Sequence, residues 1–442
     1  MISNCKSRNS IYNPIKTDMK RFLSFLGTGD YKPCRYRLND QTSQTVVYVQ
    51  TATNLFADPH CDEAVVFCTA KAQEKHETGL LAEFSANGLP GPRIVPIPDG
   101  ASEEQLWEIF RVVRDVVGDG DEIVFDVTHS FRSLPVVMTV LLRYLAAVKK
   151  TTIGACLYGA WEARDEEKNV APVFDLTPFF ALDDWTHAIR SFEEYGDPLA
   201  LRGLAAEKLG PLCGHDAAAR TLNEAVRKMA AFATNIRLSN LGTVDGKFGV
   251  LSMKLRSDIA EPLSRRGVSA AVPVLEPVLE RAAGTFSAFD DHEIRNGFRA
   301  ARWAAAHGLL PQACTLLQET VVSIVCEQNS VICEQYRDLR PKKKTFREVR
   351  VFVSNVLGSA GEPKKLADWK PPVESDVALA LANALPPGFT APWDRLKKIR
   401  NSVNHAGTNP EEPVRPDASD YRPDTLFKLA DALENALYPD SK

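Results

Sequence analysis

Residues 123–157 read IVFDVTHSFRSLPVVMTVLLRYLAAVKKTTIGACL, and this stretch decides the fold of the N-terminal half. The runs 123–125 and 153–157, rich in β-branched and apolar residues, predict two strands. Residues 134–149 between them predict a helix that is apolar nearly all round, which is typical of a helix packed on the face of a sheet. This order of strand, helix and strand predicts a parallel sheet, because two parallel strands need a crossover connection.

The same alternation extends toward the N-terminus. Further strands are predicted at 22–26, 45–49, 64–68 and 94–97. Pro96 lacks an amide hydrogen, so the last of these strands belongs at an edge. A helix is predicted to begin at Ser102, which forms a capping box with Gln105, and to stop at Gly118. The fold class predicted for this half is α/β, with a doubly wound, Rossmann-like parallel sheet.

The second half of the chain has a different pattern. From about residue 183 onward few strands are predicted. Ala- and Leu-rich stretches at helical spacing occur at 217–238, 270–286, 294–307, 311–327, 376–385 and 425–437. This half is therefore predicted to be all-α. The stretch 239–270, with Gly242, Gly246 and Gly249, is predicted to be a loop or small insertion, and no role is assigned to residues 197–270.

The composition of the chain limits the classes of protein to which it can belong. The 442 residues carry a net charge of −4, so any nucleic-acid site must be a local basic patch. Nine cysteines without a CxxC pair are typical of reduced thiols, which favours a cytoplasmic location. The longest apolar run, 135–148, contains Arg143 and is too short to span a bilayer. No His, Cys, Asp and Glu cluster has convincing metal-ligand spacing, so no metal is predicted.

Two loops of the N-terminal half follow predicted strands directly. Gly27-Thr28-Gly29 comes after the first strand, where glycines allow a phosphate or base to approach the backbone. Thr128, His129, Ser130 and Arg132 follow the strand 123–125 and lead into a helix. Ligands of open α/β sheets bind at such strand ends, and these groups suit an anionic ligand. A tight turn without a ligand remains the alternative for each loop.

One motif near the C-terminus suits metal-free cleavage of RNA. Arg400-Asn401-Ser402-Val403-Asn404-His405 ends a predicted helix before Gly407. The imidazole of His405 titrates near neutrality and can move a proton of the 2′-hydroxyl or the 5′-oxygen. The guanidinium of Arg400 can stabilise charge on the phosphorane, and Asn401, one turn before His405, can orient the imidazole or the phosphate. DNA lacks the 2′-hydroxyl and would be spared.

The same spacing of arginine and histidine occurs a second time. Arg302 and His307 are also five residues apart, but the residues between them are apolar, so this copy is predicted to be a packed helix. A basic cluster at 337–350 could guide RNA phosphates or could be a solvated helix face. The polar copy at 400–405 is therefore the better candidate for catalysis.

These segments together resemble a known family. The DVTHSFR segment at 126–132, the Gly27-Thr28-Gly29 loop and the terminal RNxxxH are similar to those of the CARF–HEPN ancillary ribonucleases of type III CRISPR systems. The stretch 301–313, from Ala301 to Ala313, is similar to the helix pair that precedes the catalytic helix there. The resemblance runs in order from about residue 20 to 440, except for 197–270.

The resemblance implies a function in antiviral defence. Residues 1–19 are polar and patternless, are predicted to be a loose extension and are not matched by the resemblance. For the rest, the resemblance implies a CARF sensor domain at 20–190 and a helical region at 191–442, with a linker or insertion at about 191–290 and a HEPN domain at about 291–442. CARF domains pair in a homodimer and bind cyclic oligoadenylate, most often cyclic tetra-adenylate. Binding activates the paired HEPN domains, which cleave single-stranded RNA without a metal. Assembly beyond the homodimer is left as an alternative. Neither DNA nor a membrane is expected as a partner.

By this resemblance, Arg400, Asn401 and His405 are the catalytic residues. The residues that face the cyclic oligoadenylate are Gly27, Thr28, Gly29, Thr128, His129, Ser130 and Arg132. Three alternatives remain: a sensor whose HEPN part does not cut, a ring nuclease that degrades its own ligand at 128–132, and a transcriptional regulator. The absence of a clear basic recognition helix disfavours the regulator.

Overall fold

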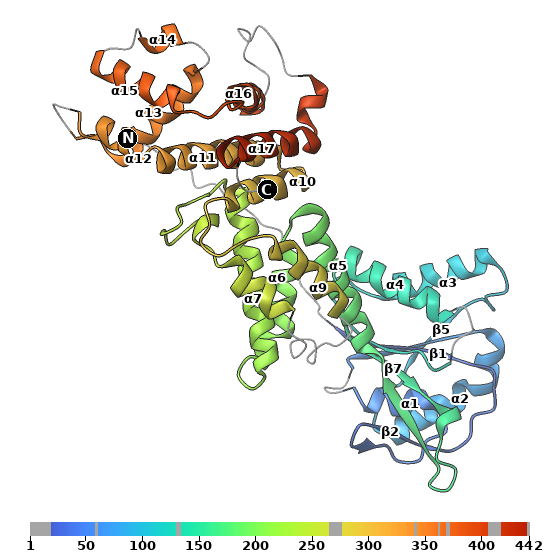
Figure 1. The fold of residues 1–442 in the computed structure, drawn as a ribbon. Coiled ribbons are helices and arrows are strands. Elements are labelled where there is room, and N and C mark those ends of the chain that lie inside the picture. The colour runs from blue at the N-terminus through green and yellow to red at the C-terminus, as the bar shows by residue number, and fades with distance from the viewer. Residues whose placement is uncertain are drawn as a thin grey trace, which may run out of the picture. The chain divides into compact units, whose positions relative to one another are not determined.

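A computed structural model describes residues 19–57, 61–129, 134–264, 276–339, 343–360, 363–367, 372–404 and 417–439. The predicted extension at 1–19 lies outside these residues except for Met19. The chain divides into two compact units, Met1–Ala181 and Leu182–Lys442 (Figure 1). Among the described residues, no helix combines the length and the apolar character that crossing a bilayer requires.

The first unit is built on one eight-stranded sheet with the order β3-β2-β8-β7-β6-β1-β4-β5. The strands are β1 (Lys20–Leu26), β2 (Arg35–Leu38), β3 (Gln41–Thr42), β4 (Glu63–Cys68), β5 (Arg93–Pro96), β6 (Glu122–Asp126), β7 (Thr152–Gly159) and β8 (Val170–Asp175). β1 pairs in parallel with both β4 and β6. β5 lies at the edge, as Pro96 requires. The predicted α/β class is confirmed.

Helices cover both faces of this sheet (Figure 1). Phe22 and Leu26 of β1 pack in one core with α1 (Val49–Leu55) and α2 (Ala70–Ala86). Leu23 and Phe25 pack in a second core with α3 (Glu103–Val116) and α4 (Leu134–Lys149). Alternate side chains of a strand point to opposite faces, so one apolar run supplies both cores.

Two features of the sheet differ from the sequence prediction. Residues 45–49 do not form a strand of the sheet: Val46 makes an isolated bridge with Cys34, and Val49 begins α1. Burial of Val49 and Ala52 against the sheet outweighs the weak strand preference of β-branched residues. The sheet is also not wholly parallel, because β8 pairs with β7, and β3 with β2, in the antiparallel direction.

The second unit is helical, as predicted. Its helices are α6 (Leu199–Lys208), α7 (Ala217–Arg237), α8 (Glu261–Leu263), α9 (Glu276–Ser287), α10 (Asn296–Ala306), α11 (Leu310–Gln328), α12 (Ser330–Arg337), α13 (Phe346–Ser359), α14 (Pro363–Ala367), α15 (Pro372–Asn383), α16 (Thr390–Asn404) and α17 (Pro423–Leu437). The division between the units falls within α5 (Thr177–Tyr195). Phe180 of α5 belongs to a core of the first unit, and Trp185 and Phe192 belong to the core of the second.

The centre of the second unit is the tight packing of α10 on α11. A Cβ added to Gly297 of α10 would meet the side chain of Thr320 on α11, whose own Cβ would be 2.8 Å away. Thr320 is fully buried, and its hydroxyl donates to the Leu316 carbonyl at 2.6 Å. The glycine is therefore required by the close approach of the two helices.

We expect Gly297→Ala to lower the free energy of unfolding by about 1 to 3 kcal/mol, because the new methyl group overpacks a filled core. Urea unfolding of the full chain measures this change. In a double-mutant cycle Thr320→Ala makes room for the methyl group, so the combined loss should be smaller than the sum of the two single losses. Additive losses would contradict this account of the packing.

Candidate functional site

The ends of β1 and β6 form the switch point of the sheet. These two strands are neighbours and run in parallel. After β1 the chain passes by way of β2 and β3 to α1 on one face, whereas after β6 it passes to α4 on the other. Loops that leave adjacent strands toward opposite faces open a crevice at the carboxyl end of the sheet, where ligands bind.

The structure brings the two predicted ligand loops together at this switch point. A Cβ on Gly27 would lie 3.7 Å from the Cβ of His129. Thr28 and Gly29 are exposed, and a Cβ on Gly29 would meet nothing within 4 Å. Ser130 and Arg132 lie outside the described residues. The backbone at Gly29 is therefore open, whereas Gly27 lies against the His129 side chain.

Three side chains that the sequence analysis did not single out complete this crevice. The Tyr31 ring packs against His129 and His76, with centroid separations of 4.7 and 4.8 Å. The Tyr31 hydroxyl accepts from the Gly27 amide at 2.8 Å, and His76 Nε2 donates to the Gly29 carbonyl at 2.9 Å. Lys75 Nζ donates to the Thr28 carbonyl at 3.1 Å. Of these three residues, only Tyr31 could have been linked to the predicted ligand loop from the sequence, because it follows Gly27 by four residues.

Burial sets the charge of the crevice. It lowers the pKa of His129, and it also lowers that of His76. Both rings are therefore neutral near pH 7 and act as hydrogen-bonding and stacking groups. Lys75 is the cation next to the loop after β1, where it also pairs with Asp30 at 2.6 Å.

The Thr128 hydroxyl is used within the protein. It donates to Asp126 Oδ1 at 2.5 Å and accepts from the Gly159 amide at 2.8 Å. Asp126 is fully buried and also accepts from Ser24 Oγ at 2.9 Å and from the Thr128 amide at 3.0 Å. The Thr128 side chain therefore helps to hold this turn in place.

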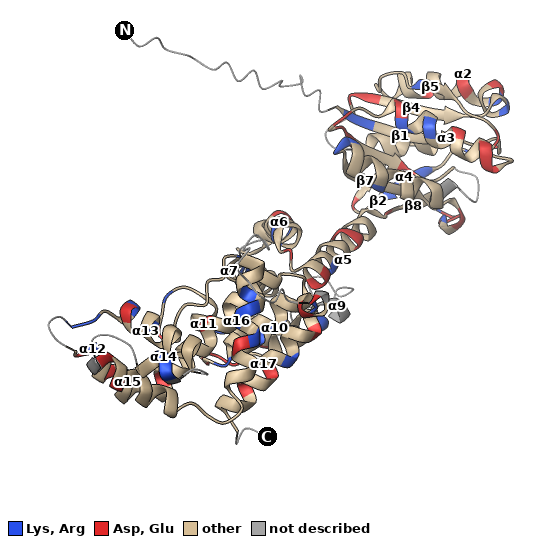
Figure 2. Cartoon of the chain, turned by 90° about the horizontal axis from the view of Figure 1, so that it is seen from above, with Lys and Arg blue, Asp and Glu red and all other residues tan. Residues whose placement is uncertain are grey.

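In the second unit, α16 presents one apolar face and one polar face. Leu396 and Ile399 are buried in the core, as the predicted stripe requires, and Val403 packs against it. Trp393, Lys397, Arg400 and Asn401 of α16 line a pocket of about 410 Å³. Figure 2 shows Lys and Arg residues along this helix. His405 lies outside the described residues.

The walls of this pocket come from α11 and α13. They are Gln318 of α11 and Ser354, Asn355, Gly358 and Ser359 of α13, none of which was predicted from the sequence. Lys397 Nζ donates to the Gly358 carbonyl at 3.1 Å. Among the described residues that line the pocket there is no carboxylate, so two cations, hydroxyls and amides dominate it. Such a set of groups is suited to an anion.

Arg400, which lines this pocket, has an unsatisfied donor. Its Nε is buried and has no hydrogen-bond partner among the described residues. Buried polar groups are almost always paired, so an orphaned guanidinium nitrogen points to a missing acceptor. Cys314 on α11 lies in reach of the Arg400 charge, but burial raises the pKa of its thiol to about 12, which excludes it as a thiolate nucleophile near pH 7.

The second arginine–histidine copy is structural, as predicted. The Arg302 guanidinium donates to Asp431 and to Glu434, both at 2.6 Å. His307 stacks on Trp303 with ring centroids 3.9 Å apart. In the basic cluster, Arg350 pairs with Glu319 at 2.6 Å and Lys343 with Asp338 at 3.1 Å, while 340–342 lie outside the described residues.

Comparison with known proteins adds one relationship. No protein-family model matches the chain. Over 130 residues, or 29% of the chain, it is 33% identical to the CRISPR-associated protein MJ1674 of Methanocaldococcus jannaschii. By sequence, the chain is a relative of a CRISPR-associated protein. The matched stretch spans 20% of that relative's length. This agrees with the CARF–HEPN resemblance of the sequence.

Among solved structures, the chain is similar to Csm6 of Enterococcus italicus, which was solved bound to cyclic hexa-2′-fluoro-hexa-dAMP. The identity is 13%, the TM-score is 0.39, and 96% of this chain and 95% of the other are covered. A TM-score of this size does not establish a common fold. In the part of the chain that the structure describes, no group of three or more His, Cys, Asp or Glu residues is placed to hold a metal ion.

The Asp126 network gives a testable prediction for the crevice. We expect Asp126→Ala to lower the free energy of unfolding by about 2 to 3 kcal/mol, because it leaves buried donors of Ser24 and Thr128 without an acceptor. Asp126→Asn should cost less, since the amide oxygen still accepts. Urea unfolding of both variants measures the difference, and an equal loss in both would contradict the role of the acceptor.

A control is the pH dependence of the difference in unfolding free energy between the native chain and Asp126→Asn. Burial raises the pKa of Asp126 above its ordinary value of 3.8. The folded state therefore binds the proton more tightly, and the native protein loses stability as the pH rises from 3.8 through the folded pKa. The variant lacks this titration, so its deficit relative to the native chain should shrink over that range.

Proposed function

We propose that this chain is a metal-independent endoribonuclease that cleaves single-stranded RNA in type III CRISPR defence and is activated by cyclic oligoadenylate. The observation that carries the proposal is the Arg400 guanidinium, which has an unsatisfied buried nitrogen in a pocket whose described lining contains no carboxylate. The relationship to a CRISPR-associated protein supports the biological setting.

The chemistry follows from the groups around the pocket. The 2′-hydroxyl of RNA attacks the adjacent phosphorus, the bond from phosphorus to the 5′-oxygen breaks, and a 2′,3′-cyclic phosphate and a 5′-hydroxyl result. His405 handles the proton that leaves the 2′-oxygen or the one that the 5′-oxygen gains. Arg400 and Lys397 stabilise the charge on the phosphorane, and Asn401 orients the phosphate. No step needs a divalent ion.

The crevice of the first unit is the proposed sensor site. Exposed Gly29 backbone and the neutral ring of His129 offer hydrogen bonds and stacking to an adenine ring, and Lys75 offers a charge to a phosphate. Ser130 and Arg132 remain part of the proposed site. A cyclic oligoadenylate has approximate two-fold symmetry, so two copies of the crevice in a homodimer can bind one ring. Cyclic tetra-adenylate is the proposed activator.

The outer face of α4 supports the homodimer. Val136, Val140 and Val148 are 69%, 60% and 58% exposed, and Tyr144 lies between them at the same helical spacing. Apolar residues four apart form a continuous stripe on one side of a helix. Tyr144 is 39% exposed and packs in part on Phe110, but the three valines stay largely open, and an exposed apolar stripe is typical of an interface with another chain.

The catalytic proposal is tested by a ribonuclease assay in EDTA, with and without each cyclic oligoadenylate. Activator-dependent cleavage should fall at least about a hundredfold in Arg400→Ala, because the charge stabilisation of the phosphorane is lost. Arg395→Ala is the matched control, since Arg395 lies on the same helix, is exposed and pairs with Asp420 outside the pocket. Equal cleavage by both variants, or intact RNA at every activator concentration, would overturn the proposal.

The dimer proposal has a separate test. Val140→Glu should convert the dimer into a monomer in light scattering coupled to size exclusion, because a charge in the middle of an apolar interface is not solvated. Val331→Glu, at a position of the second unit that is 68% exposed, should leave the dimer intact. A dimer of unchanged stability in Val140→Glu would exclude the α4 stripe as the interface.

A further inference from the structure

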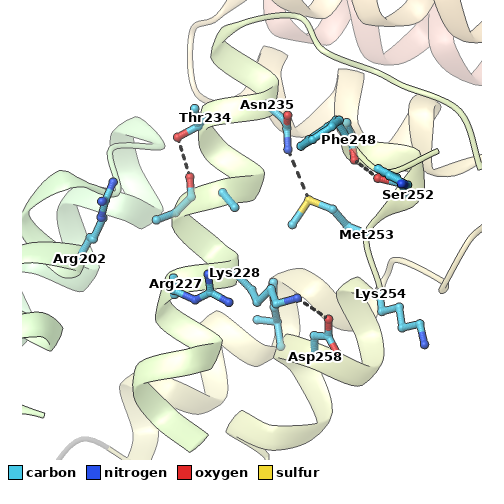
Figure 3. A pocket seen from close by; sticks show the side chains of 15 residues that line it. Arg202, Arg227, Lys228, Thr234, Asn235, Phe248, Ser252, Met253, Lys254 and Asp258 are labelled. Atoms are coloured by element: carbon cyan, nitrogen blue, oxygen red, sulfur yellow. Dashed lines mark hydrogen bonds and ion pairs between the residues drawn. The ribbon is translucent and has the colours of Figure 1, made fainter. Parts of the chain in front are cut away.

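A second pocket of the helical unit lies within the segment that had no assigned role. It has a volume of about 750 Å³ and is lined by α6, α7 and residues 247–259, which include the short turns η3 (Val250–Ser252) and η4 (Arg256–Ala260) (Figure 3). Five cationic side chains line it: Arg202, Arg227, Lys228, Lys247 and Lys254. Among its described lining residues, Asp258 is the one carboxylate. It shares no residue with the pocket around Arg400.

The positive charge of this pocket is only partly balanced. Lys228 Nζ lies 3.1 Å from Asp258 Oδ2, and Arg227 bonds Glu224 at 2.7 and 2.9 Å. The side chains of Arg202, Lys247 and Lys254 have no acceptor among the described residues. Cations that no protein acceptor neutralises are free to contact phosphates, and they release counterions when they do so.

A loop closed by two backbone hydrogen bonds places an aromatic side chain at the same pocket. Phe248 is 80% exposed, the largest fraction among the large apolar side chains that the structure describes. The base of its loop is closed by Val250 N donating to the Asn240 carbonyl at 3.1 Å and Leu251 N donating to the Leu241 carbonyl at 3.0 Å. The base of the loop is anchored in the core by three buried residues, Leu241, Val250 and Leu251. The tip that carries Phe248 therefore extends from an anchored base.

Two glycines make this loop possible. Gly242 and Gly249 have φ values of +70° and +101°, which other residues rarely adopt. A Cβ on Gly249 would lie 2.6 Å from the Gly242 Cα. The two arms of the loop therefore approach each other too closely for a side chain at this position. The exposed ring is therefore a feature of a fixed conformation.

We infer that this pocket, with Phe248 at its rim, docks single-stranded RNA outside the cleavage site. Unbalanced cations contact successive phosphates, and the exposed ring stacks on a base, a combination that binds single strands with little sequence preference. The inference rests on the proposed function in taking RNA as the substrate. Both pockets belong to the same unit, in which α7 packs on α11, and α11 lines the cleavage pocket through Gln318.

The test measures binding of a fluorescent oligouridylate by anisotropy in the Arg400→Ala background, where cleavage cannot consume the probe. Lys247→Glu combined with Lys254→Glu should weaken binding at least about tenfold and reduce the slope of log K against log salt by about 1.4, or about 0.7 for each phosphate contact. Phe248→Ala should weaken binding about fivefold or more.

Matched controls separate docking from general charge or hydrophobicity. Lys71→Glu combined with Arg111→Glu makes the same charge change at exposed positions of the first unit, and Leu238→Ala removes an exposed side chain beside the loop but outside the pocket. Neither should change the affinity by more than about twofold.

Three results would overturn the inference: equal affinity of pocket and control variants, an unchanged salt slope, or displacement of the RNA by polyglutamate of equal charge. The last result would assign the pocket to an acidic protein. Because the measurement is binding, it decides the site even if the native chain cleaves no RNA, in which case only the proposed cleavage fails.

Discussion

One buried carboxyl, that of Asp126, ties together the ends of three strands. It accepts from Ser24 of β1, belongs to β6 itself, and reaches β7 through the Thr128 hydroxyl, which accepts from the Gly159 amide. These strand ends border the point where the chain turns to opposite faces of the sheet. A fully satisfied polar network fixes geometry that apolar packing alone would leave adjustable. The ligand loops therefore stand on a rigid base, although Asp126 itself cannot touch a ligand.

The pocket around Arg400, which we propose as the cleavage site, is built in the opposite way, around a cation whose Nε has no acceptor among the described residues. Arg302 and Arg400 both precede a histidine by five residues, and both are partly buried on helices of the same unit. Arg302 meets Asp431 and Glu434, which complete its hydrogen bonds. Arg400 shares its pocket with hydroxyls and amides, and its Nε has no partner in the part of the chain that the structure describes. Whether an arginine finds acceptors for its donors is thus set by the residues opposite it and not by its spacing from a histidine.

The same contrast between local pattern and surroundings explains which features could be predicted from the sequence. Local patterns predicted the strands around 123–157, the helix 134–149 and the Leu396–Ile399 face of α16, because burial of one face repeats at a fixed period. They failed at 45–49, where long-range packing outweighed strand preference, and they gave no hint of the antiparallel β8. Ser354 and Asn355 were out of reach, since only the packing of α13 beside α16 brings them to Arg400.

The charge distribution supports the proposal that both pockets of the helical unit bind the same polyanion. The chain as a whole carries a charge of −4, and many of its exposed cations are paired, such as Arg395 with Asp420 and Lys343 with Asp338. A polyanion gains little from such paired surfaces, because each contact must displace a carboxylate. It gains most where acceptors are missing, at Arg400 and around Phe248. Local imbalance of charge on an acidic protein therefore favours these two pockets over the remaining surface as sites for a polyanion, which supports the proposal that RNA binds there.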